Sequence, residues 1–292
     1  MTGARRPTAA VALAFVLAAL LALPFLALGL AMPRQGQPAP LPAARTLYLP
    51  EGSWRYEEAG SGDEVVLFLH GFNQDAGAWD AVWVRLDACR CRRIRVDLPG
   101  FGASRFRGDD FGLAPQARRL AEFLDAVGAS RATLVGVSMG GSLAAWFAAA
   151  YPQRVSKLVL LSPSGYEGSL THDGLFGRLL RPGRLNQAAG WLARTRLYAA
   201  LFPRSVARQA LAVSASYGRP WVEALPRIDA PTVVAWARGD PVANADSAER
   251  IARAIPRATL AWFDEEAGHS LPQSRPQQVA DLLGTTPGDA QR

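Results

Sequence analysis

A serine between two glycines lies where a buried strand is expected to turn into a helix. The apolar run Ala132–Val137 is typical of a strand buried on both faces, and residues 139–151 form a helical pattern of mostly small side chains. The motif Gly136-Val137-Ser138-Met139-Gly140 joins them. Glycines leave room for a tight, strained bend that exposes the serine hydroxyl. We therefore predict a nucleophile elbow carrying Ser138; the alternative is a structural turn that happens to contain serine.

Short apolar runs alternate with helical patterns along most of the chain. This alternation predicts an α/β fold: a doubly wound, mostly parallel sheet preceded by an antiparallel ribbon. The predicted strands are 47–49, 53–58, 65–69, 93–98, 132–137, 155–161, 231–237 and 258–263, and the predicted helices are 113–127, 139–151, 245–255 and 276–283.

One interval, 164–228, contains helical patches but no convincing strand. It lies between two predicted core strands, so the chain must leave the sheet and return. It opens from the strand end that should carry the site, which favours a helical cap over that site. The alternative is a helical insertion that packs on the sheet edge. Its aromatic residues suit a lipid-like substrate or simply form the core of the cap itself; they are Phe176, Trp191, Tyr198, Phe202, Tyr217 and Trp221.

A serine hydroxyl needs a base to become a good nucleophile, and the chain has three histidines. His70 ends a predicted strand and His172 lies in the interval 164–228. His269 follows the last predicted strand, and a site of this kind lies at the carboxyl ends of the strands with the base last in chain order. We predict that His269 is the base.

The base must in turn be oriented by a carboxylate. Asp240 follows the strand 231–237 and falls between the serine and the histidine in chain order, so we predict that it is the acid. Asp246 is instead expected to cap the next helix. The acidic residues 264–266 lie too close to His269 along the loop to orient it.

Two backbone N–H groups are expected to bind the oxyanion. One belongs to Met139, at the helix N-terminus directly after the nucleophile. The other should come from the loop after the strand 65–69, and Phe72 is the expected donor.

These motifs together resemble the α/β-hydrolase fold family, in particular the capped serine esterases and lipases of its ester- and C–C-bond-cleaving branch. The resemblance covers about residues 65–283. It implies a Ser138–Asp240–His269 triad, an acyl-enzyme intermediate, no cofactor, and a structural role for Asp97. It rests on the stretches 70–72, 97–104, 136–141, 151–161, 239–240 and 268–269. A metal is not expected, because four-ligand spacing is absent from the sequence.

The N-terminus carries an uncharged segment, 8–32, preceded by Arg5 and Arg6. Its length suffices for a membrane-spanning helix, whereas Pro24 and the small residues 29–31 also fit a cleaved signal peptide. The arginines favour export of the rest of the chain in either case. The expected organisation is an anchor or signal peptide at 1–32, a Pro-rich tether at 33–44, a core at 45–163 and 229–284, a helical cap at 164–228 and a flexible tail at 285–292.

The net charge is +7, carried almost entirely by arginine. Scattered surface arginine is the favoured interpretation over attraction to an anionic surface. No nucleic-acid-binding pattern is present, so such a partner is not expected. The pair Cys89 and Cys91 lacks metal spacing and is expected to be two thiols, because one intervening residue makes a mutual disulfide awkward.

The function expected is hydrolysis of carboxylic esters with a hydrophobic acyl group, by a protein that is membrane-anchored or exported. Hydrolysis of C–C bonds or a perhydrolase-like activity is the enzymatic alternative, and export argues against C–C substrates, which usually arise in the cytoplasm. A scaffold with a dead site is the non-enzymatic alternative. The expected partner is a small ester, with membrane association through the N-terminal segment.

Overall fold

The computed structural model describes residues 41–86, 89–166, 181–201 and 206–284. Nine strands of this part of the chain form one sheet in the order β1-β2-β4-β3-β6-β7-β8-β9, with β5 beside β2. The strands are β1 Ala44–Leu49, β2 Gly52–Ala59, β3 Val65–Leu69, β4 Arg92–Val96, β5 Arg105–Phe106, β6 Ala132–Val137, β7 Val155–Leu161, β8 Thr232–Ala237 and β9 Ala258–Phe263.

The pairing confirms the predicted architecture. β4, β3, β6, β7, β8 and β9 are parallel neighbours, whereas β2 pairs antiparallel with β1, β4 and β5. The ribbon β1–β2, predicted as an antiparallel ribbon, therefore forms one edge of the sheet. Each predicted strand agrees with an observed one to within a few residues at its ends.

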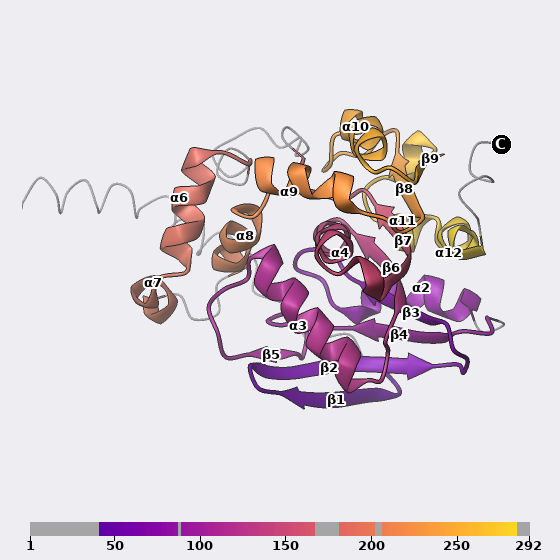
Figure 1. Cartoon of the computed structure of the whole chain (residues 1–292), viewed down its shortest axis with the longest axis horizontal. Helices are drawn as coiled ribbons and strands as arrows, with labels where there is room; N and C mark the ends of the chain where they lie inside the picture. The colour runs from indigo at the N-terminus through magenta and orange to yellow at the C-terminus, as the bar shows by residue number, and fades with distance from the viewer. Residues whose placement is uncertain (1–40, 87–88, 167–180, 202–205, 285–292) are drawn as a thin grey trace, which may run out of the picture.

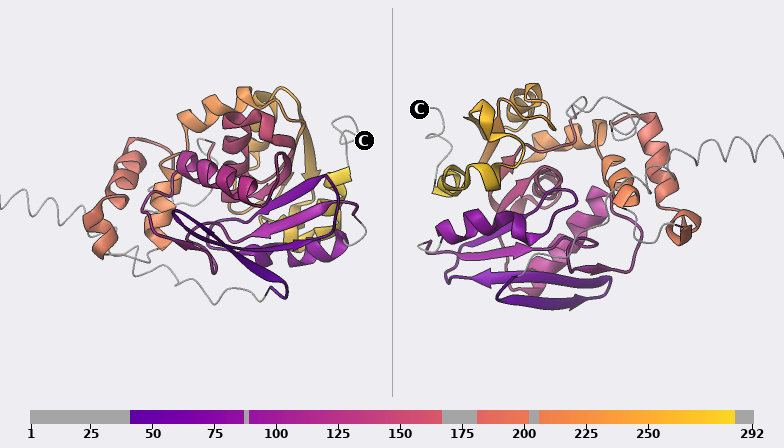
Figure 2. Two further views of the ribbon diagram at one scale, coloured as in Figure 1. Left: turned by 60° about the horizontal axis from the view of Figure 1, so that its bottom comes forward. Right: turned by 180° about the vertical axis from the view of Figure 1, so that it is seen from behind.

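Helices cover both faces of the sheet (Figures 1 and 2). The side chains of β3 show why: Leu67 and Leu69 face one buried cluster, while Val66 and Phe68 face the other. Such alternation between two apolar faces requires a helical layer on each side. The first layer contains α3 Leu113–Ala126, α4 Met139–Ala150 and α10 Asp246–Ala254; the second contains α2 Asp80–Trp83, α11 Leu271–Ser274 and α12 Pro276–Gly284.

Four helices of the described residues lie between β7 and β8 in chain order, where the sequence shows no strand. They are α6 Arg184–Ala193, α7 Arg196–Leu201, α8 Val206–Ser214 and α9 Arg219–Ala224. α6 and α7 project at the end of the molecule away from α12 (Figure 1). Short 3-10 turns complete the described chain, namely η1 Ala76–Trp79, η2 Val84–Leu86, η3 Pro152–Arg154, η4 Leu225–Arg227 and η5 Glu265–Ala267.

The two cysteines form a disulfide, so the expectation of two thiols is wrong. The chain bends at Arg90 and Cys91, just before β4, and this bend brings the Cα atoms of Cys89 and Cys91 to 5.2 Å. That separation lies within the range that a disulfide spans, whereas an extended chain would hold the two residues farther apart.

Several predictions concern residues outside the described ranges. The segment 8–32, His172, Phe176, Phe202, the tail 285–292 and most of the tether 33–44 belong to this group. Within the described ranges, no helix is both long and apolar enough to cross a membrane.

Candidate active site

Ser138 occupies the bend between β6 and α4, as predicted. Its backbone has φ 52° and ψ −118°, a conformation that costs free energy for a residue with a side chain. The Ser138 N–H donates to the Leu161 carbonyl of β7 at 2.9 Å, and its carbonyl accepts from the Ser142 N–H at 3.0 Å. These bonds fix the strained residue at the carboxyl end of the sheet with its side chain partly exposed.

The bend is possible only because two glycines flank it at close range. A Cβ atom on Gly136 would lie 2.4 Å from the Gly140 carbonyl oxygen. One on Gly140 would lie 2.2 Å from the Leu69 oxygen and 2.5 Å from the His70 oxygen, at the end of β3. Because all these atoms belong to the backbone, a side chain at either position would force the strands and α4 apart.

His269 and Asp240 form a hydrogen-bonded pair. Nδ1 of His269 lies 2.8 Å from Oδ2 of Asp240. The other carboxylate oxygen accepts the N–H groups of Val242 and Ala243, both at 2.8 Å. The Asp240 side chain is fully buried, while the His269 side chain is 18% exposed and so can face a substrate.

The environment of Asp240 favours its charged form. Burial raises the pKa of this carboxyl group. The hydrogen bond and charge of His269 and the two backbone N–H groups lower the pKa by a larger amount, so the net pKa lies below the ordinary value. A carboxylate held in this way fixes the orientation of the imidazole and leaves Nε2 of His269 as the acceptor on the other side of the ring.

The parallel strands bring the three predicted residues to the carboxyl end of the sheet. Ser138 follows β6, Asp240 follows β8 and His269 follows β9, and these parallel strands end on the same side. The structure places Asp240 and His269 in contact; among the described residues, no hydrogen bond joins the Ser138 hydroxyl to His269. Such bonds are often long before substrate binds.

The competing acids lie elsewhere. Asp264 forms an ion pair with Arg275 at 2.6 Å. Asp246 begins α10, but its side chain does not cap the helix; the Asn244 side chain accepts the Asp246 N–H instead. The sequence therefore predicted the start of that helix correctly and its capping residue wrongly.

His70 is fully buried and has a structural environment. Its Nε2 accepts the Leu98 N–H at 2.9 Å, and its Nδ1–H donates to the Gly71 carbonyl at 2.7 Å. Burial lowers the pKa of His70, which keeps the ring neutral and both bonds intact. The histidine thus ties the loop after β3 to the loop after β4.

Asp97, on the loop after β4, is likewise buried and fully bonded. Its carboxylate accepts the N–H groups of Ala76 at 2.8 Å and Ala103 at 2.7 Å, and it pairs with Arg55. These contacts agree with the structural role that the resemblance implied.

The two expected oxyanion donors belong to segments that adjoin Ser138. Met139 is the first residue of α4, so its N–H has no acceptor within the helix. The loop carrying Phe72 lies alongside, because a Cβ atom on Gly71 would be 3.5 Å from Cβ of Ser138. The Phe72 ring packs edge-on against Phe101 and helps to hold that loop.

A buried hydroxyl network behind the nucleophile was not predicted. The Ser142 hydroxyl donates to the Ser138 carbonyl at 3.1 Å and lies 3.1 Å from the Ser164 hydroxyl, which lies 2.8 Å from the Tyr217 hydroxyl. Trp221 donates to the Ser142 carbonyl at 3.2 Å. This network joins α4 to α9 and to the chain leaving β7. Nothing in the local sequence pattern distinguishes these residues from ordinary core positions.

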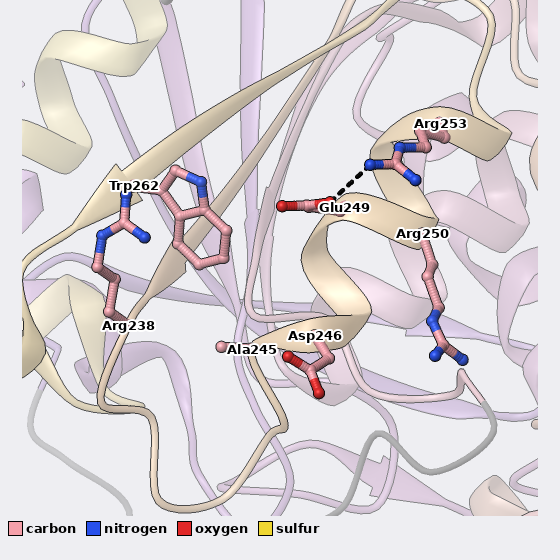
Figure 3. A pocket seen from close by; sticks show the side chains of 7 residues that line it. All are labelled: Arg238, Ala245, Asp246, Glu249, Arg250, Arg253 and Trp262. Atoms are coloured by element: carbon pink, nitrogen blue, oxygen red, sulfur yellow. Dashed lines mark hydrogen bonds and ion pairs between the residues drawn. The ribbon is translucent and has the colours of Figure 1, made fainter.

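Two surface depressions are lined by described residues, and neither contains the triad. One, of about 420 Å³, lies between β9 and α10; Figure 3 shows Arg238 beside the Trp262 ring and the Glu249–Arg253 ion pair on the helix. The other, of about 780 Å³, lies beside β5 and α3. No group of three or more potential ligand side chains that could hold a metal occurs in the described ranges.

The doubly wound sheet, the strained serine at its carboxyl edge and the buried acid–histidine pair define a class of protein. The chain belongs to the alpha/beta hydrolase family, whose model matches residues 66–282. It is therefore a hydrolase by family, as the motifs indicated.

Two proteins and one solved structure of this family are similar to the chain over the ranges given below. The chain is 28% identical over 249 residues to monoacylglycerol lipase abhd6-A of Xenopus laevis, covering 75% of this chain and 73% of that protein. It is 40% identical over 119 residues to 2-hydroxy-6-oxo-6-phenylhexa-2,4-dienoate hydrolase of Comamonas testosteroni, covering 39% and 41% of the two chains. The crystal structure of a membrane phospholipase A, a bacterial virulence factor, matches with a TM-score of 0.65 and 27% identity over 94% of this chain and 93% of that one.

Proposed function

We propose that the protein hydrolyses carboxylic esters with Ser138 as nucleophile. Nε2 of His269 takes the hydroxyl proton as Oγ attacks the ester carbonyl carbon, and Asp240 stabilises the imidazolium that forms. The carbonyl oxygen becomes an oxyanion, to which the N–H groups of Met139 and Phe72 donate.

The tetrahedral intermediate then collapses to an acyl-enzyme. His269 returns the proton to the departing alkoxide, so the alcohol leaves neutral and the acyl group stays on Ser138. Water attacks this acyl-enzyme with His269 again acting as base, which releases the carboxylic acid and restores the serine. No cofactor is required in either half of the reaction.

The observation that carries this proposal is the Asp240–His269 pair. A buried carboxylate that accepts two backbone N–H groups and contacts a partly exposed imidazole is an unfavourable arrangement to maintain for structure alone, because burial of a charge costs free energy. The strands that precede Ser138, Asp240 and His269 are parallel and end on the same side of the sheet, which supports a chemical role for the pair.

The substrate class that we propose is an ester with a hydrophobic acyl group. The names of two relatives, a monoacylglycerol lipase and a membrane phospholipase A, support this class. The helices α6–α9, which follow the strand end next to Ser138, are proposed to cap the site and to select the acyl chain.

C–C bond hydrolysis is the second candidate, because a relative at 40% identity over part of the chain is a hydrolase of 2-hydroxy-6-oxo-6-phenylhexa-2,4-dienoate. A direct comparison separates the two: kcat/KM for p-nitrophenyl esters of increasing acyl length, with and without micelles, against the same constant for that dienoate. We expect ester turnover that favours longer chains. Faster turnover of the dienoate than of every ester would reject the proposal.

We also propose that the catalytic domain lies on the extracytoplasmic side, either anchored by the segment 8–32 or released after its cleavage. The uncharged segment behind Arg5 and Arg6 supports export. Alkaline extraction of membranes, followed by N-terminal sequencing, distinguishes the two forms. Full-length protein in the cytosolic fraction would contradict both.

A further inference from the structure

α6 and α7 expose an unusual amount of apolar surface. Leu185 is 59% exposed, Trp191 66% and Leu197 72%. They are three of the five large hydrophobic side chains that are exposed among the described residues; the other two, Tyr48 and Val84, lie on β1 and η2. Exposure of a tryptophan side chain to this degree is unfavourable in water, so the exposure of Trp191 requires an explanation.

Packing of the helices on one another does not explain this exposure. The opposite face of α6 packs against α7 and α8, where Ala189 and Ala193 form a small buried cluster with Tyr198 and Leu211. Asn186 donates to the Ser214 hydroxyl of α8 at 2.8 Å. Among the aromatic residues predicted for this interval, Tyr198, Tyr217 and Trp221 are buried as a helical core requires, but Trp191 is not.

The exposed side of α6 forms a continuous stripe. At about 100° per residue, Arg184, Leu185, Ala188 and Trp191 fall within an arc of roughly 120°, and all four are exposed. Leu197 and Arg196 extend this surface onto α7, whose start is fixed because the Tyr198 N–H donates to the Thr195 hydroxyl at 3.2 Å. We call Arg184, Leu185, Trp191, Arg196 and Leu197 the α6–α7 face.

Positive charge is concentrated in the same part of the chain. Residues 174–222 contain eight arginines and no acidic residue, whereas the rest of the chain contains 24 basic and 25 acidic residues. The excess charge of the protein is therefore not scattered, contrary to the favoured interpretation of its composition. On the described helices, Arg184 and Arg196 are exposed beside the apolar side chains.

We infer that the α6–α7 face docks on an anionic lipid surface. Exposed tryptophan and leucine side chains enter the region between headgroups and acyl chains, and the arginines beside them attract anionic headgroups. A second copy fits this face poorly, because a two-fold pairing would bring the arginines of both copies together without an acidic partner. The inference goes beyond the proposed reaction and does not depend on which bond the enzyme cleaves.

Quenching of Trp191 by lipid tests this inference on the full chain. The protein and its Trp191→Phe variant are reconstituted into vesicles of phosphatidylglycerol with brominated acyl chains, and their difference in emission isolates Trp191. We expect strong quenching of that difference signal, and weaker quenching in zwitterionic phosphatidylcholine or at high salt. Arg184→Gln and Arg196→Gln should each weaken the association about fivefold.

Matched controls use exposed residues on other faces: Tyr48→Ser on β1 and Arg253→Gln on α10 should leave the quenching unchanged. Equal quenching in the protein and in Trp191→Phe overturns the inference. Emission of Trp191 that shifts to the blue with protein concentration in the absence of lipid also overturns it, since a second copy then covers the face. A soluble short-chain ester, assayed on the same samples, tests the proposed reaction separately.

Discussion

Asp240 illustrates how one side chain combines a stability cost with the role that we propose for it as the catalytic acid. Its carboxylate is buried, yet three donors keep it charged and aimed at His269. We expect Asp240→Asn to lower kcat by about 10,000-fold, because the amide would favour the wrong imidazole tautomer. Steady-state kinetics on a soluble ester measures this. Asp264→Asn, which changes an exposed carboxylate paired with Arg275, should retain nearly full activity; equal losses in the two variants would argue against Asp240 as the acid.

His70 gives a prediction for the pH dependence of stability. Burial lowers the pKa of His70 below the ordinary 6.5. Just below pH 6.5 this histidine is therefore protonated in the unfolded chain and still neutral in the folded chain. The contribution of neutral His70 is present above pH 6.5 and is lost as the pH falls toward the lower folded pKa. Urea unfolding should show a loss of up to about 1.4 kcal/mol per pH unit from this residue in that window.

The matched variant is His70→Gln, which cannot titrate. We expect it to be less stable than the parent by about 1–3 kcal/mol at neutral pH, because its bonds to Gly71 and Leu98 are lost or weakened. Its stability should also vary less with pH below 6.5. An unchanged pH slope in this variant would mean that another group causes it.

At the scale of elements, the junction of β6 and α4 depends on the absence of a side chain at Gly140. Gly140→Ala would place Cβ 2.2 Å from a backbone oxygen of β3, so we expect a loss of stability of about 3 kcal/mol or more. Gly183→Ala is the control, since a Cβ there meets nothing within 4 Å. Thermal unfolding of both variants measures the difference, and a Gly140→Ala protein as stable as the control contradicts the proposed tightness of the elbow.

Hydrophobic pattern explains why the elements were predictable. The central strands are continuous apolar runs bounded by loops, and β6 and β7 were predicted with their observed bounds. The prediction of Ser138, Asp240 and His269 as the triad rested on the predicted strands that they follow. The disulfide and the Ser142–Ser164 network were not predictable, because each depends on a local bend or on a contact between distant segments that periodicity does not encode.

Across the whole molecule, the Cys89–Cys91 disulfide fits the proposed export, since disulfides persist mainly in oxidising compartments. It closes a very short loop, so its removal should cost less than about 2 kcal/mol. Urea unfolding of Cys89→Ser/Cys91→Ser measures this cost. Non-reducing mass spectrometry of protein from its native compartment should show a mass lower by two hydrogens than after reduction; two free thiols there would contradict the proposed location.

The three residues of the proposed triad follow strands that end at the carboxyl end of the sheet, and the sequence places its excess positive charge in the segment that follows β7. This arrangement would let the protein meet a lipid surface with the same helices that are proposed to cap the site. The sequence contained the charge pattern, but its meaning depended on knowing which side chains α6 and α7 leave exposed.

The central claim is that Ser138 is the nucleophile, and labelling with a fluorophosphonate probe tests it most directly. We expect one covalent adduct, located on Ser138 by mass spectrometry of peptides, and its absence in a folded Ser138→Ala variant whose kcat is about a million-fold lower. Ser270→Ala, on the exposed loop beside His269, should label normally. Failure of the probe to label the folded protein, or equal labelling of Ser138→Ala, would contradict the account.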